Sequence, residues 1–70
     1  MNILQIRASH NPYPTSQDTF YTVKYVHRGE LHYANVVQDH TTLACYWDRG
    51  PKKHKKLCPV EVDIAVRSLH

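Results

Sequence analysis

The stretch of residues 20–37 constrains the fold most, because it has the sequence form of a β-hairpin. Two runs rich in β-branched and aromatic residues flank a short polar link that contains Gly29. Gly29 can supply the positive φ that closes a three-residue turn with a bulge. Such a turn predicts that Val26 lies opposite Glu30, and that Lys24 lies opposite His32.

The predicted register sorts the side chains of the hairpin onto two faces, because successive residues alternate across a strand. The face expected to meet the core comprises Tyr21, Val23, Tyr25, Leu31, Tyr33, Asn35 and Val37. The mixed face carries Phe20, Thr22, Lys24 and His32, a small aromatic and basic surface of the kind that single-stranded nucleic-acid binders use for base stacking. The alternative, which the sequence favours, buries Phe20 and Val36 beneath the Pro-containing loop of residues 9–18.

Three further segments complete the predicted sheet. Residues 2–8 alternate and predict a first strand with Leu4 and Ile6 on one side. Residues 41–47 fit a strand, although Asp39 could instead cap a helix there. Residues 59–69 place β-branched residues at strict period two and predict a strand, with a helix beginning at Pro59 as the alternative.

Together these segments predict a mostly β protein. Five short strands suit a small five-stranded antiparallel sheet or open barrel around the hairpin. The alternative is an α+β fold with a helix at 41–48, at 59–69, or at both. Seventy residues make one domain, 1–70, which buries only about 60% of the surface of its unfolded chain.

The chain has no apolar run near the roughly 20 residues that cross a bilayer, and no signal-peptide pattern. We therefore expect a cytoplasmic protein without a membrane partner, in which the two cysteines are reduced.

The net charge of +3 is unevenly distributed. All of the positive excess lies in a basic loop, residues 49–58, of which residues 49–56 carry five cations and no anion. Phosphate is the common neighbour of such a cluster, although charge runs are often merely solvated. The predicted anion-binding residues are Arg49, Lys52, Lys53, His54, Lys55 and Lys56, with Arg28 and Lys24 in support.

Two His and two Cys form the ligand set of a tetrahedral zinc site: His40, Cys45, His54 and Cys58. Their spacings match no common zinc finger, and the apolar run around Cys45 favours a core thiol. A disulfide between Cys45 and Cys58 is a further alternative. The same Cys and His residues could form a nucleophile and base, but so short a domain has little room for a substrate cleft, so we expect no enzyme and no cofactor.

These features predict a non-enzymatic accessory or regulatory protein that binds the phosphate backbone of DNA or RNA through the basic loop. An acidic protein surface is the other partner that this loop would suit. The alternative function is a protein-interaction module or inhibitor of the kind that phages encode, which would use a sheet edge or aromatic surface. An exposed patch of Tyr13, Phe20, Tyr46 and Trp47 would favour that alternative, and an open sheet edge would also permit a homodimer.

Overall fold

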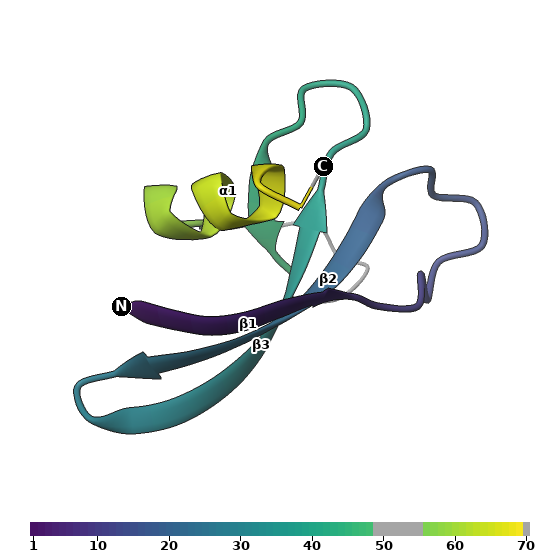
Figure 1. The fold of residues 1–70 in the computed structure, drawn as a ribbon. Helices are drawn as coiled ribbons and strands as arrows, with labels where there is room; N and C mark the ends of the chain where they lie inside the picture. Colours follow the sequence, from purple (N-terminus) through teal and green to yellow (C-terminus); the bar gives the residue numbers. More distant parts are fainter. Residues whose placement is uncertain (49–55, 70) are drawn as a thin grey trace.

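The computed structural model describes residues 1–48 and 56–69 of the chain. Five strands form one antiparallel sheet in the order of the sequence, and a single helix follows them (Figure 1). The elements are β1 (Asn2–Ala8), β2 (Thr19–His27), β3 (Glu30–Gln38), β4 (Cys45–Trp47), β5 (Lys56–Leu57) and α1 (Val60–Arg67). The predicted mostly β class and the open five-stranded sheet are confirmed.

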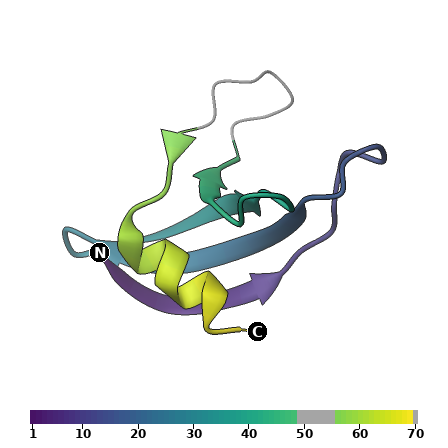
Figure 2. The ribbon, with the colours of Figure 1, turned by 90° about the horizontal axis from the view of Figure 1, so that it is seen from above.

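The sheet is strongly twisted, and α1 lies across one of its faces (Figure 2). The main core forms between them. It consists of Val62 and Val66 of α1, of the strand residues Tyr21, Val23, Val36 and Cys45, and of Cys58, which follows β5. The opposite face of β1, β2 and β3 is not covered by the helix, and we call it the outer face.

The turn of the hairpin is one residue shorter than predicted. His27 pairs with Glu30, which leaves Arg28 and Gly29 as a two-residue turn with φ of 53° and 77°. Positive φ at both positions defines a type I′ turn, whose twist matches that of the two strands. This match outweighs the roughly 1–2 kcal/mol that left-handed backbone costs at Arg28.

The shorter turn shifts the register of β3 by one residue, so that Lys24 lies opposite Tyr33. Tyr21, Val23 and Tyr25 of β2 face the core side as predicted. The predicted assignment of β3 residues to the two faces of the sheet was wrong, because a one-residue shift exchanges the faces of a strand. Leu31 and Tyr33 are 52% and 65% exposed, and the core side instead receives His32, Ala34 and Val36.

Strand β1 has the predicted bounds but not the predicted alternation. Its pairing with β2 shifts between Ile3 and Gln5, which is a β-bulge. The bulge turns both Ile3 and Ile6 toward the core and leaves Leu4 half exposed, so the inward position predicted for Leu4 was wrong.

The strand predicted over residues 41–47 is confirmed only at Cys45–Trp47. The preceding residues form a turn in which the Asp39 side chain accepts hydrogen bonds from the backbone N–H of Thr41 and Thr42. Asp39 thus caps a turn and not a helix, and Leu43 follows with a φ of 66°.

The strand predicted over residues 59–69 is wrong, and the helical alternative is correct. Pro59 precedes the first helical residue, acidic Glu61 and Asp63 lie in the first turn, and Arg67 lies in the last, as the helix dipole favours. A further strand would have left the concave face of the sheet bare. A helix instead buries Val62 and Val66 against that face, which is why packing overrides the period-two pattern.

Strand β5 lies within the range of the predicted basic loop 49–58, whose last residues therefore belong partly to the sheet. Among the described residues, no helix has the length and apolar character required to cross a membrane.

Candidate nucleic-acid interface

The predicted anion-binding residues divide into two groups. Five of them lie outside the described residues: Arg49, Lys52, Lys53, His54 and Lys55. The other three are placed by the sheet. Lys24 lies within β2, Arg28 forms the tip of the hairpin, and Lys56 begins β5 directly opposite Trp47.

A groove opens beside β3 where β4 ends, and we call it the sheet-edge groove. Strand β4 has three residues, whose partners on β3 are Val36, Val37 and Gln38, after which the Asp48 N–H donates to the Asn35 carbonyl at 2.9 Å. The groove has a volume of about 340 Å³. Its lining residues are Tyr25, Ala34, Asn35, Trp47, Asp48 and Lys56.

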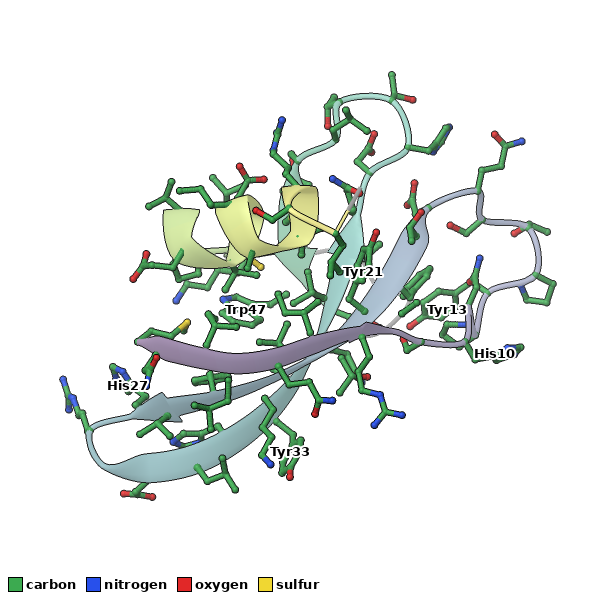
Figure 3. All side chains as sticks on the ribbon, viewed as in Figure 1. His10, Tyr13, Tyr21, His27, Tyr33 and Trp47 are labelled. Carbon is green, nitrogen blue, oxygen red and sulfur yellow. The ribbon has the colours of Figure 1, made fainter. Side chains whose placement is uncertain are left out.

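The wall of the groove is aromatic. The rings of Tyr25 and Trp47 have centroids 6.2 Å apart and are tilted by 37°. His32 stacks on Tyr25 with centroids 5.2 Å apart and an interplanar angle of 19°. All three are partly buried, and Trp47 points to the side of the sheet that carries α1 (Figure 3). Because each ring is held by a neighbour, the wall is preformed.

The rim of the groove is polar, with Asp48 and the Lys56 ammonium, whereas the Asn35 side chain lies on the outer face beside Thr22. Asp48 also accepts a hydrogen bond of 3.5 Å from the Tyr13 hydroxyl. Burial and the nearby Asp48 carboxylate together raise the pKa of Tyr13, which keeps that hydroxyl protonated. The chain leaves the described part after Asp48 and returns to it at Lys56, so the sequence of residues 49–55 joins two lining residues of one groove.

The outer face carries a second polar and aromatic surface. The Lys24 ammonium lies 5.9 Å from the centroid of the Tyr33 ring, within cation–π range. Beside them the Thr22 hydroxyl and the Asn35 side-chain oxygen are 3.4 Å apart, and Arg7 pairs with Thr22 in the register. Figure 3 shows Tyr33 on the side of the sheet away from α1.

This surface lacks two members of the predicted mixed face. His32 is not part of it, because the register shift moves His32 to the core side, where it stacks on Tyr25. Phe20 is 4% exposed and packs against Tyr13, with ring centroids 5.6 Å apart. The predicted burial of Phe20 is thus confirmed, whereas Val36 lies in the main core and Val37 is the cross-strand partner of Phe20.

Sequence reasoning missed Tyr33 and Arg7 on the outer face and the joint role of Tyr25 and Trp47 in the groove. A two-residue turn at Arg28 and Gly29 was the signal that would have placed Tyr33 beside Lys24.

The aromatic residues proposed as a protein-docking patch are not exposed together. Phe20 is buried, and Tyr13, Tyr46 and Trp47 are each partly buried. The criterion that would have favoured an aromatic protein-docking surface is therefore not met.

The described members of the predicted zinc set lie apart. His40 is on an exposed turn, where its Nδ1 lies 2.7 Å from an Asp18 carboxylate oxygen. Cys45 and Cys58 are free thiols in the main core, and the Cys58 N–H donates to the Cys45 carbonyl at 3.0 Å. His54 lies outside the described residues. In the described part of the chain, these residues form no group of three with ligand atoms near one another.

The chemistry of the two thiols also disfavours metal binding. Burial, reinforced by the Asp63 carboxylate, raises the pKa of Cys45 to about 11. Burial raises the pKa of Cys58 to about 12. A zinc ligand or a nucleophile must be a thiolate, so both cysteines are suited to a core role, which the sequence favoured for Cys45.

One group with metal-ligand atoms does occur among the described residues, formed by Asp18, Asp39 and His40. Each carboxylate already has hydrogen-bond donors. Asp18 accepts from the His40 backbone N–H at 3.0 Å, and Asp39 accepts from Thr41 and Thr42. These bonds explain the cluster, because they link the residue before β2 to the turn that follows β3.

Comparison of the chain with models of protein families, with curated proteins and with solved structures gave no match.

Proposed function

We propose that this protein is a small non-enzymatic nucleic-acid-binding protein, an accessory factor that contacts the phosphate backbone through residues 49–56. The observation that carries this proposal is the separation of charge. The described residues contain five Lys and Arg against six Asp and Glu, so the whole positive excess of the chain belongs to residues 49–55. Phosphate contacts are the usual reason for such a concentration of cations.

The placement of the other charges supports the proposal. Arg28 lies at the tip of the hairpin, whereas Asp18 and Asp39 lie at its opposite end, beyond the nine-residue strands β2 and β3. Glu61 and Asp63 are on α1. These four anions are thus away from Arg28. The exceptions are Glu30, which follows the Arg28–Gly29 turn, and Asp48, which lines the groove next to Lys56.

The test is a titration of labelled single-stranded and duplex oligonucleotides, followed by fluorescence anisotropy at several salt concentrations. The logarithm of the affinity should fall linearly with the logarithm of salt concentration, with a slope of about −0.7 to −0.9 per phosphate contacted. Replacing Lys52, Lys53, Lys55 and Lys56 by Gln together should weaken binding and reduce that slope by about 3.

A matched pair of single variants controls for loss of charge alone. Lys56→Gln and Arg67→Gln each remove one cation, but Arg67 lies on α1, where it bonds to Asp63. Only Lys56→Gln should weaken binding. Equal affinity of the fourfold variant and the wild-type protein, with the fold verified by circular dichroism, would reject the proposal.

A second candidate function, contact with another protein molecule, is favoured by an apolar patch beside α1. Leu57, Val60 and Ile64 are 62%, 64% and 59% exposed. Leu57 and Val60 line one groove, and Ile64 follows Val60 by one helical turn. A two-fold contact between copies would use this patch twice. Sedimentation velocity would then show a dimer that Ile64→Lys dissociates, and a monomeric wild-type protein at all concentrations would exclude it.

A further inference from the structure

We infer that the sheet-edge groove binds an unpaired nucleobase, so that the protein selects single-stranded over duplex nucleic acid. The inference rests on the proposed function, because it names the form of nucleic acid that the same protein would bind.

The shape of the groove suits one planar ring. Its volume of about 340 Å³ is at the lower end of the roughly 300–1,000 Å³ typical of small-molecule sites. Tyr25 and Trp47 supply the aromatic wall, and the stacking of His32 on Tyr25 holds that ring in place. Aromatic side chains of this kind hold single strands by stacking on successive bases, which requires bases that are not stacked within a duplex.

The rim supplies a hydrogen-bond acceptor for an unpaired base. The Asp48 carboxylate accepts hydrogen bonds. A carboxylate repels phosphate but accepts from the amino and imino groups of a base edge. In a duplex those groups are already paired. Asp48, the one anion in the lining, therefore suits a base better than a phosphate.

Lys56 connects the groove to the phosphate backbone. It lies directly opposite Trp47 across the β4–β5 pair, and both residues line the groove. Directly opposed residues have Cβ atoms about 5 Å apart, so a backbone held by Lys56 passes beside the aromatic wall. The base attached to that backbone can then enter the groove while its phosphate stays at the ammonium.

The outer face offers the competing surface for stacking. Tyr33 is more exposed than either groove ring, but the Lys24 side chain already lies over its ring. Tyr33 and Tyr25 lie on opposite faces of the sheet, and the same substitution can be made at each. Tyr33→Leu is therefore the matched control for Tyr25→Leu.

Trp47 is the only tryptophan of the chain, so its intrinsic fluorescence reports directly on the groove. The wild-type protein is titrated with a single-stranded oligonucleotide of about 12 nucleotides, within the usual site sizes, and with the duplex of the same sequence. We expect the single strand to quench Trp47 and to bind at least about tenfold more tightly than the duplex.

The variants then locate the stacked base. Tyr25→Leu and Trp47→Phe should weaken single-strand binding, about tenfold for the former, and leave the salt slope unchanged, since no charge is lost. Tyr33→Leu should stay within about twofold of wild type. Circular dichroism and thermal unfolding verify the fold, and the fluorescence titration of the wild-type protein needs no variant.

The outcomes separate the two proposals. Salt-dependent binding without quenching of Trp47, or with equal affinity for the duplex, would overturn the inference that the groove binds a base. The proposed function would then still stand. Loss of binding in Tyr33→Leu but not in Tyr25→Leu would move the stacking to the outer face and also overturn the inference. Absence of binding to either oligonucleotide at low salt would reject both.

Discussion

At the scale of single residues, the turn at Arg28 and Gly29 decides the register of the hairpin. Both residues have positive φ, and a Cβ added at Gly29 would meet no atom within 4 Å. Gly29→Ala should therefore cost only backbone strain, about 1–2 kcal/mol of unfolding free energy. Arg28→Asn should stabilise the turn by a few tenths of a kcal/mol or more, because Asn tolerates this conformation better. Urea unfolding measures both, and an unchanged midpoint for Gly29→Ala would contradict the type I′ turn.

Asp39 should make the free energy of unfolding depend on pH in the acidic range. The backbone N–H groups of Thr42 and Thr41 lower the pKa of this carboxyl, so the folded state binds its proton less readily than the unfolded chain. The resulting stabilisation is present above the ordinary pKa, about 4, and is lost as pH falls through the lowered value. The stability difference between wild type and Asp39→Ala should accordingly be constant near neutral pH and shrink in acid. A difference that grows in acid would show that the turn holds the protonated form.

The raised pKa values of Cys45 and Cys58, about 11 and 12, predict inert thiols. At pH 8 the thiolate fraction should be lower than that of a free cysteine by roughly a hundredfold or more. A disulfide reagent should therefore label the native protein slowly and the urea-unfolded protein at once. Rapid labelling of the native protein at pH 8 would show that the β4–β5 side of the core opens to solvent.

At the scale of elements, the burial of α1 follows a helical and not a strand period. Val62 and Val66 are fully buried, whereas Val60 and Ile64 are mostly exposed. Val66→Ala should destabilise the protein by about 2 kcal/mol, because it leaves a cavity between α1 and the sheet. Ile64→Ala, on the same helix, should change stability by less than about 0.5 kcal/mol. Urea unfolding of the pair checks the orientation of the helix, and equal losses would contradict it.

At the scale of the whole molecule, the described residues are nearly neutral in sum, and residues 49–55 are strongly basic. A ligand that binds only the folded state at 100 times its Kd adds about 2.7 kcal/mol of stability. For a chain of 70 residues this corresponds to a rise in Tm of about 10 °C or more. Single-stranded oligonucleotide should produce that rise at low salt and lose it at high salt, as differential scanning fluorimetry would show. A rise that persists at high salt would indicate a contact that does not depend on phosphate charge.

The sequence was sufficient for the positions of the long strands and for the concentration of charge. Strands β1, β2 and β3 follow from local β-branched and aromatic runs, and the basic segment from a simple count of Lys and Arg. The core role of Cys45 likewise follows from its apolar neighbours. These properties depend on residues that are adjacent in the chain, so local sequence patterns are sufficient to predict them.

Tertiary structure decided the rest. The side on which Tyr33 lies depends on whether the hairpin turn has two or three residues, a choice made by the twist of two paired strands. The helix at Val60–Arg67 depends on a concave sheet face that needs a cover, which no local pattern contains. The groove formed by Tyr25, Trp47 and Lys56 combines residues of three strands at the point where β4 ends. Such a site exists only after folding, because strand pairing, and not sequence proximity, brings its residues together.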